Sequence, residues 1–245
     1  MNEGLNPRPL LATLLALSLL SCPAFGAGSP ASRIPPVWKV EHLPLISVPT
    51  KVQGRDEMAV LLTGDGGWAQ TDKGLSEALS KGGIPVVGWN SLRYFLTRKS
   101  PDRATKDLER ILRHYLPLWH KEKVILIGYS FGADVMPFLA NRLPPDLAER
   151  VSLIVLLGPS GAADFRFHPT EWLGKVADDS RPVLPEIVKL GSKEILCAYG
   201  QAEKESLCLK LPAGKAHLLM RPGGHIIAKS YGPIAESILG HRTPA

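Results

Sequence analysis

The chain has 245 residues, a length that allows one large domain or two small ones at roughly 150 residues per domain. Hydrophobic residues make up 44% and charged residues 21%, and these proportions exclude a disordered chain and a polytopic membrane protein. The formal net charge of +6 favours anionic surroundings such as phospholipid headgroups. The basic runs are short, so we expect no direct contact with nucleic acid.

Residues 1–26 have the pattern of a secretory signal peptide. Arg8 precedes an apolar run over 10–20, which is close to the length of a signal-peptide core and too short to span a bilayer. Small residues before position 27 provide a cleavage site. The alternative is a lipoprotein signal over 1–21, which would leave Cys22 as the lipidated first residue. Either alternative predicts an exported protein.

A Pro-rich linker and a first strand occupy 27–56, and we expect the main domain over 57–245. Short apolar runs alternate with helical patterns there, which predicts an α/β fold with a mostly parallel central sheet and helices on both faces. Most runs are unbroken, as in strands buried on both faces. The expected strands are 37–48, 58–62, 84–88, 124–127, 151–157, 195–198 and 217–220, and the expected helices are 72–81, 104–115, 131–141 and 226–239.

Residues 158–191 lack strong periodicity and contain several prolines. A segment of this length inside a compact domain is often a lid over a functional site. An ordinary helical excursion is the alternative, and both stay open.

A nucleophile motif, G-x-S-x-G, stands at 128–132 between an expected strand and an expected helix. The turn in such a motif strains the serine backbone, and the flanking glycines avoid collisions with neighbouring elements. It would expose Ser130 as a nucleophile at the carboxyl edge of the sheet. It would also bring the N–H of Phe131 to a helix N-terminus, where it could stabilise an oxyanion. Asp134, in the first helical turn, is expected to complement the helix dipole.

A serine nucleophile needs a base and an acid, which follow it in the order acid, histidine in α/β-hydrolases. His225 lies in a Gly-rich loop directly after the last expected strand and is the expected general base. Glu203 and Glu205 follow the preceding strand. Either could orient the imidazole. We favour Glu203 for its position after the strand and keep Glu205 as the alternative acid.

The loop 63–68 follows an early strand and contains three glycines. Its backbone could approach a substrate oxygen closely, so an N–H of Gly66, Gly67 or Trp68 is the expected second oxyanion donor. Asp65 either acts as a turn residue or receives a substrate ammonium. The sequence contains no metal-binding constellation, and no cofactor is implied.

Removal of the signal leaves two cysteines, Cys197 and Cys208. An even pair in an exported chain predicts a disulfide, and two buried free thiols are the alternative. The bridge would bracket both candidate acids and hold their loop in place.

Four segments together, 63–68, 91–95, 128–135 and the loop 197–208, resemble the VirJ/AcvB family of bacterial virulence proteins. The resemblance covers about residues 57–240. The chain resembles the short, single-domain VirJ form of the family. It implies an α/β-hydrolase fold and a location in the Gram-negative periplasm. AcvB-type members are associated with hydrolysis of aminoacylated phosphatidylglycerol, lysyl or alanyl, and VirJ is linked to type IV secretion.

The resemblance therefore implies a serine esterase whose substrate is a phospholipid at the membrane surface. Arg93 and Lys99 are candidates for contact with the lipid phosphate, and Asp65 for contact with the aminoacyl ammonium. Two alternatives stay open. The chain could be a lipase or thioesterase for another substrate class, or a non-catalytic partner or chaperone of secretion-system proteins.

Overall fold

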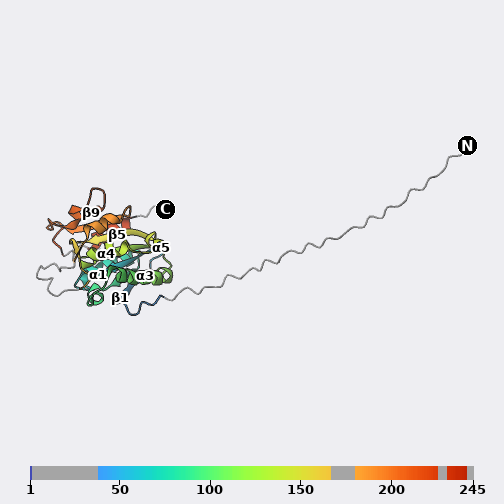
Figure 1. The fold of residues 1–245 in the computed structure, drawn as a ribbon, viewed down its shortest axis with the longest axis horizontal. Coiled ribbons are helices and arrows are strands. Elements are labelled where there is room, and N and C mark those ends of the chain that lie inside the picture. The colour runs from blue at the N-terminus through green and yellow to red at the C-terminus, as the bar shows by residue number, and fades with distance from the viewer. Residues whose placement is uncertain (2–37, 167–179, 226–230, 242–245) are drawn as a thin grey trace. The chain divides into compact units, whose positions relative to one another are not determined.

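The structure is a computed structural model that describes residues 1, 38–166, 180–225 and 231–241. The chain divides into two units, Met1–Pro36 and Val37–Ala245, and every helix and strand given below belongs to the second (Figure 1). Within the described ranges, no helix is long and apolar enough to cross a membrane. The expected signal peptide and Cys22 lie outside the described residues.

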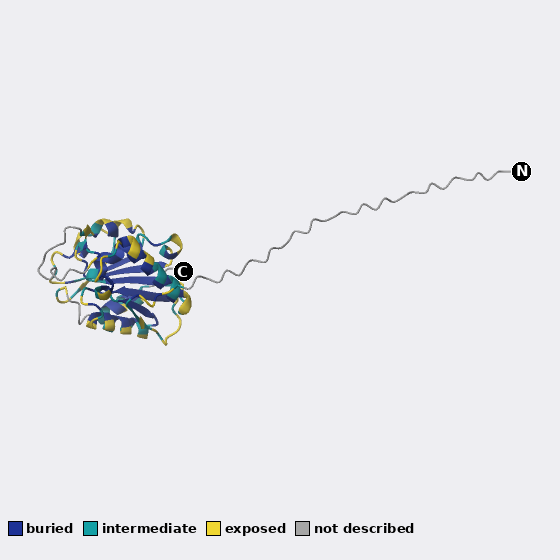
Figure 2. Cartoon of the chain, turned by 60° about the horizontal axis from the view of Figure 1, so that its bottom comes forward, coloured by how far each residue is buried: buried dark blue, intermediate teal, exposed yellow. Residues whose placement is uncertain are grey.

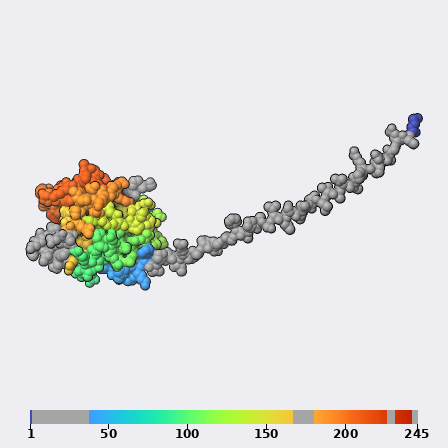
Figure 3. Space-filling view, in the orientation of Figure 1, coloured from blue at the N-terminus to red at the C-terminus, as the bar shows by residue number. Residues whose placement is uncertain are grey.

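A seven-stranded sheet runs through the second unit in the order β1-β3-β2-β4-β5-β8-β9. Its strands are β1 (Leu45–Val48), β2 (Glu57–Leu62), β3 (Val86–Trp89), β4 (Lys123–Tyr129), β5 (Val151–Leu157), β8 (Ile195–Gly200) and β9 (His217–Arg221). Only the pairing of β1 with β3 is antiparallel among these strands. The blue and orange ends of the compact body in Figure 3 correspond to the two edges of this sheet.

Helices connect the strands and pack on both faces of the sheet. They are α1 (Gln70–Lys81), α2 (Ser91–Tyr94), α3 (Pro101–Leu118), α4 (Phe131–Ala140), α5 (Pro145–Ala148), α6 (Leu184–Lys189) and α7 (Tyr231–Gly240), with a 3₁₀ turn η2 (Leu207–Lys210). A second, two-stranded sheet pairs β6 (Ala162–Ala163) with β7 (Arg181–Pro182). The start of α3 is encoded locally, because Ser100 accepts the N–H of Arg103 at 3.1 Å and Pro101 occupies the first helical position.

The hydrophobic core consists of two layers, one on each face of the sheet (Figure 2). Alternate residues of β2 point to opposite faces: Val60 contributes to the layer under α3 and α4, and Leu61 to the layer under α1 and α7. Both side chains are fully buried, and burial of each stabilises the fold by about 1.5–3 kcal/mol. The predicted apolar strands at the centre of the sheet, β2, β3, β4 and β5, therefore lie where both faces are covered.

Two expectations differ from the structure in extent. The expected strand 37–48 is wrong in its first part, since β1 begins only at Leu45. The residues before it form a turn, in which the N–H of Leu43 donates to the carbonyl of Val40, and Pro44 has no N–H to donate to a sheet. In the expected lid, the described residues form β6, β7 and α6, and residues 167–179 lie outside the described ranges.

Candidate active site

Ser130 lies at the turn between β4 and α4 in a strained backbone conformation. Its φ is 51° and its ψ is −116°, a positive φ that residues with a side chain rarely adopt. The flanking glycines are required by close packing. A Cβ on Gly132 would lie 2.1 Å from the carbonyl oxygen of Leu62, and one on Gly128 would lie 2.3 Å from the carbonyl oxygen of Gly132. The surrounding backbone therefore allows no larger residue at either side of the turn.

Ser130, His225 and Glu203 form one hydrogen-bonded chain. The Oγ of Ser130 lies 2.8 Å from Nε2 of His225, and Nδ1 of His225 lies 2.8 Å from Oε1 of Glu203. An ionised carboxylate only accepts hydrogen bonds, so Nδ1 donates to Glu203 and Nε2 is left to accept from the serine hydroxyl. In this arrangement the histidine can take the proton of the serine.

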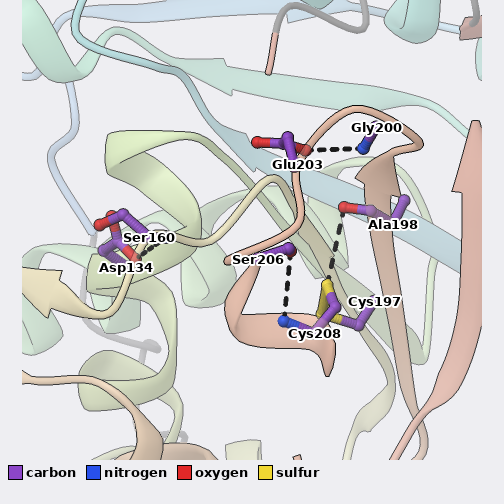
Figure 4. Close-up of a disulfide and its surroundings, with 8 residues drawn as sticks. All are labelled: Asp134, Ser160, Cys197, Ala198, Gly200, Glu203, Ser206 and Cys208. Atoms are coloured by element: carbon purple, nitrogen blue, oxygen red, sulfur yellow. Dashed lines mark hydrogen bonds between the residues drawn. A yellow bond between two sulfur atoms is a disulfide. The ribbon is translucent and has the colours of Figure 1, made fainter. Parts of the chain in front are cut away.

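The carboxylate of Glu203 is held by a second hydrogen bond. Its Oε2 accepts the N–H of Gly200 at 2.6 Å (Figure 4). The loop that contains Glu203, between β8 and η2, is called the acid loop. It is also joined to the loop after β9 that contains His225, because the N–H of Ala202 donates to the carbonyl of Gly223 at 2.9 Å. A Cβ on Gly200 would lie 2.3 Å from the carbonyl oxygen of Gly224, so glycine is needed where the two loops meet.

The acid loop is closed by a disulfide between Cys197 in β8 and Cys208 in η2 (Figure 4). The expected pair of cysteines is therefore bonded, and both residues are buried. Glu205, inside the same loop, has an 89% exposed side chain that pairs with Lys210 at 2.8 Å. The structure thus brings Glu203 to His225 and turns Glu205 toward Lys210.

The loop after β2 is a tight turn beside the nucleophile. A Cβ on Gly64 would lie 3.4 Å from the Cβ of Ser130. The carbonyl of Gly64 accepts the N–H of Gly67 at 3.0 Å and the hydroxyl of buried Ser91 at 2.5 Å. The N–H of Gly67 is therefore occupied within the turn. The carbonyl of Gly64 and the N–H of Asp65 belong to the same trans peptide, in which these two groups point in opposite directions. Since the carbonyl points to Ser91, the N–H of Asp65 points away from Ser91.

The other predicted binding residues are spread around this edge. The ring of Trp68 packs against β3, where a Cβ on Gly88 would lie 2.2 Å from it. Asp65 is half-buried, and Arg93 is exposed on α2. Lys99 lines a pocket to which Arg93 does not contribute, and its Nζ donates to Oγ1 of Thr97 at 2.8 Å.

Asp134 lies one helical turn beyond Ser130 and joins α4 to the loop after β5. Its Oδ1 accepts the N–H of Ser160 at 2.8 Å, and its Oδ2 accepts the hydroxyl of Ser160 at 2.7 Å (Figure 4). Burial raises the pKa of Asp134 to about 7, although hydrogen bonds from Ser160 and Gly161 favour its charged form. Beyond complementing the helix dipole, Asp134 therefore positions the loop that begins at Gly158.

Two residues of the site were missed by the sequence reasoning. Gly158 has a φ of 63°, and a Cβ there would lie 3.2 Å from Cε1 of His225, so its lack of a side chain leaves room for the imidazole. Ser91 fixes the carbonyl of Gly64. The glycine at the end of an apolar strand was a usable signal for the first residue. Nothing local in the sequence pointed to the second.

A family model, Bacterial virulence protein (VirJ), matches residues 56–243. Among solved structures, the chain is similar to Est1E from Butyrivibrio proteoclasticus, with a TM-score of 0.53, 13% identity and coverage of 80% of this chain and 90% of that chain. MenH from S. aureus has a TM-score of 0.56 and 14% identity, with coverage of 80% of this chain and 96% of that chain. The Pyrococcus furiosus esterase Pf2001 has a TM-score of 0.54 and 15% identity, with coverage of 80% of this chain and 90% of that chain. No curated protein sequence matches the chain.

The structural similarity extends over most of this chain and nearly the whole of each solved structure, and at such low identity it concerns the fold. The expected α/β-hydrolase architecture is confirmed by these neighbours. The family match covers more than half of the sequence. The chain therefore has the α/β-hydrolase fold and belongs to the VirJ family of bacterial virulence proteins.

Proposed function

We propose that this chain is a serine esterase that hydrolyses the aminoacyl ester of aminoacyl-phosphatidylglycerol. The observation that carries the proposal is the hydrogen-bonded chain of Ser130, His225 and Glu203 at a strained strand-to-helix turn. A serine hydroxyl is a weak nucleophile unless an adjacent base removes its proton, and His225 is placed to do so. The fold that the chain shares with Est1E and the esterase Pf2001 supports an ester hydrolase.

In the first step, the Oγ of Ser130 attacks the ester carbonyl carbon as Nε2 of His225 takes the hydroxyl proton. Glu203 stabilises the imidazolium that forms. Phe131 is the first residue of α4, so the helix offers no acceptor for its N–H, and this N–H can bind the oxyanion. We assign the second donor to the N–H of Asp65, because a Cβ on the preceding Gly64 would lie only 3.4 Å from the Cβ of Ser130.

Collapse of the tetrahedral intermediate breaks the bond between the carbonyl carbon and the glycerol oxygen. His225 returns its proton to that oxygen, so phosphatidylglycerol leaves as the alcohol and the aminoacyl group remains on Ser130. A water molecule then attacks the acyl-enzyme with His225 as base. The products are a free amino acid and the restored serine.

The substrate class rests on charge and family membership. An aminoacyl ester carries an ammonium, for which the half-buried carboxylate of Asp65 is a suitable partner. The phosphate of the lipid suits a chain with a net charge of +6. The signal-peptide pattern of residues 1–26 supports a periplasmic location, where the substrate would be met at the membrane surface.

The test is hydrolysis of lysyl- and alanyl-phosphatidylglycerol by the purified protein, with release of free amino acid as the readout. Ser130→Ala should lower the rate by at least about 10⁴-fold. Ser237→Ala in α7, where the hydroxyl only bonds the carbonyl of Pro233, should keep the wild-type rate. Equal rates for wild type and Ser130→Ala, or no release from folded wild type, would contradict the proposal. The second result would favour another ester or a non-catalytic role in secretion.

A further inference from the structure

The loop after β5 forms one side of the space that the imidazole of His225 occupies. A Cβ on Gly158 would lie 3.2 Å from Cε1 and 3.3 Å from Nδ1 of His225, so the backbone of Gly158 stands against the ring. The same segment is bonded to the neighbouring strands. The carbonyl of Leu157 accepts the N–H of Ser130 at 2.8 Å, and the N–H of Gly158 donates to the carbonyl of Ala198 at 2.8 Å. A shift of this loop would therefore change the space beside the imidazole.

The imidazole of His225 depends on such a neighbour, because its side chain is 46% exposed and the two residues before it are glycines. Glycines leave a loop backbone many accessible conformations. The hydrogen bonds to Ser130 and Glu203 hold the two ring nitrogens. The ring can still tilt about the line that joins these nitrogens, and Gly158 provides the third contact that limits this tilt.

Pro159 connects Gly158 to Ser160. It is buried, and its ring fixes one of its two backbone torsions. A displacement of Ser160 is therefore transmitted to Gly158. Ser160 itself is bound through both of its donors, since Asp134 accepts its N–H at 2.8 Å and its hydroxyl at 2.7 Å (Figure 4).

Asp134 belongs to the helix that starts at the nucleophile. It lies in the first turn of α4, its N–H donates to the carbonyl of Ser130 at 3.2 Å, and only 6% of its surface is exposed. A carboxylate that only complements a helix dipole can do so from an exposed position. Burial raises the pKa of Asp134 to about 7, and the hydrogen bonds from Ser160 and the charge of a protonated His225 oppose this shift. Asp134 is therefore within electrostatic reach of the imidazole and takes its partners from the loop beside it.

We propose that Asp134 is a positioning residue for the general base, because through Ser160 it fixes the backbone of Gly158 against the imidazole of His225. The inference rests on the proposed function, since it assigns a role within that catalytic site. The role depends on the hydrogen bonds of the Asp134 side chain more than on its charge. A displacement of a catalytic group by about 1 Å can cost about 100-fold in rate, so loss of these bonds should reduce reactivity in a protein that still folds.

Three variants separate this role from a general effect on stability. Asp134→Ala removes both acceptors of Ser160. Asp134→Asn can keep both hydrogen bonds, because its carbonyl oxygen accepts the N–H of Ser160 and its amide donates to the hydroxyl oxygen. Glu186→Ala is the matched control, since Glu186 is also buried and accepts a hydrogen bond from Asn141, at the other end of α4.

The first measurement is the rate constant for labelling of Ser130 by a fluorophosphonate, under conditions in which each variant is folded. Asp134→Ala should label about 100-fold more slowly than wild type. Asp134→Asn should stay within about fivefold and Glu186→Ala within about twofold. If Asp134→Ala does not fold, Ser160→Ala removes one of the two bonds and should label about tenfold more slowly. A wild-type rate in the alanine variants of Asp134 and Ser160, or an equal loss in Asp134→Asn and Asp134→Ala, would overturn the proposal.

The second measurement follows the imidazole without any reaction. Two-bond proton–nitrogen correlations in NMR spectra report which ring nitrogen carries the proton, and His225→Gln identifies the signals. At about pH 8, where an ordinary histidine is neutral, His225 should carry it on Nδ1 in wild type and on either nitrogen in Asp134→Ala. The same single tautomer in Asp134→Ala would contradict the proposal. If folded wild type is not labelled, the proposed function fails, and the tautomers still decide whether Asp134 positions His225.

Discussion

The nucleophile turn and the acid loop reach the same histidine by different means. The turn at Ser130 lies between the central strand β4 and α4, with a positive φ at the serine, and the backbone of Gly132 packs closely against the carbonyl of Leu62. The acid loop leaves β8, next to the edge strand β9, where Leu218 and Met220 are about half exposed. A disulfide holds it there, together with hydrogen bonds from the N–H of Gln201 to the end of β9 at Arg221 and from the N–H of Ala202 to Gly223.

The difference shows how one site can be rigid at the centre of a sheet and at its edge. At the centre, the core leaves the turn no other conformation, because close packing penalises any shift. At the edge, fewer buried contacts are available, so the closed loop between Cys197 and Cys208 limits the conformations that the chain can adopt. The predictions below test each half of this comparison.

The largest effect is expected from the acid itself. Glu203→Gln keeps the size of the side chain but removes the charge that stabilises the imidazolium of His225. We expect kcat to fall by about 10³–10⁴-fold in a stopped ester-hydrolysis assay. Glu205→Gln, in the same loop but paired with Lys210, should stay within about twofold of wild type. A comparable loss in both variants would show that the loop, and not one carboxylate, matters.

The central turn can be broken by one added methyl group. Gly132→Ala places a Cβ against the carbonyl of Leu62, and we expect the free energy of unfolding to fall by about 3 kcal/mol. Gly232→Ala in α7 is the matched control, because nothing lies within 4 Å of the added Cβ. Urea denaturation of both variants measures the difference. Equal stability of the two would mean that the turn is not held by packing.

The edge loop can be loosened by removing its bridge. Cys197→Ala/Cys208→Ala should lower the free energy of unfolding by about 2–3 kcal/mol, since the opened loop regains chain entropy in the unfolded state. Turnover should fall as well, because Glu203 is then held only by hydrogen bonds. Thermal denaturation and kcat on the same samples provide the measurement. Unchanged values for both would remove the disulfide from the account.

A further effect concerns Asp134 and depends on pH, so it is seen only when stability is compared across a pH series. Its pKa in the folded state is raised to about 7 by burial, so between about pH 4 and pH 7 the folded state binds more protons than the unfolded state. The free energy of unfolding of wild type should therefore fall as the pH rises through this window, relative to Asp134→Asn, by an amount on the order of 4 kcal/mol.

Asp72 has the same sign, since burial raises its pKa to about 6, but it is present in both proteins and cancels in the comparison. Urea titrations at several pH values measure the difference between the two proteins. A constant difference from pH 4 to pH 8 would contradict the buried, titrating state of Asp134.

The sequence predicted the parts of the molecule that local patterns encode. Each expected strand overlaps an observed one. For the central strands β2, β3, β4 and β5 the reason is that unbroken apolar runs are required where both faces of the sheet are covered. The structure brings together Ser130, His225 and Glu203. The sequence indicated these residues because each of them follows an expected strand. The G-x-S-x-G motif can be recognised in the sequence because close backbone contacts at the turn require its glycines.

Contacts between distant segments could not be predicted in this way. The hydroxyl of Ser91 reaches the carbonyl of Gly64 only after β2 and β3 are paired, because the two residues follow different strands. The pocket that Lys99 and Arg166 both line arises because the two residues follow different strands of one sheet.

The central claim is that Ser130 is the nucleophile, and covalent labelling tests it most directly. The purified protein is treated with a fluorophosphonate and examined by intact mass and peptide mapping. We predict one adduct, on the peptide containing Ser130, which is absent in Ser130→Ala and forms slowly in His225→Ala. Labelling of another residue, or no labelling of the folded wild-type protein, would contradict the account.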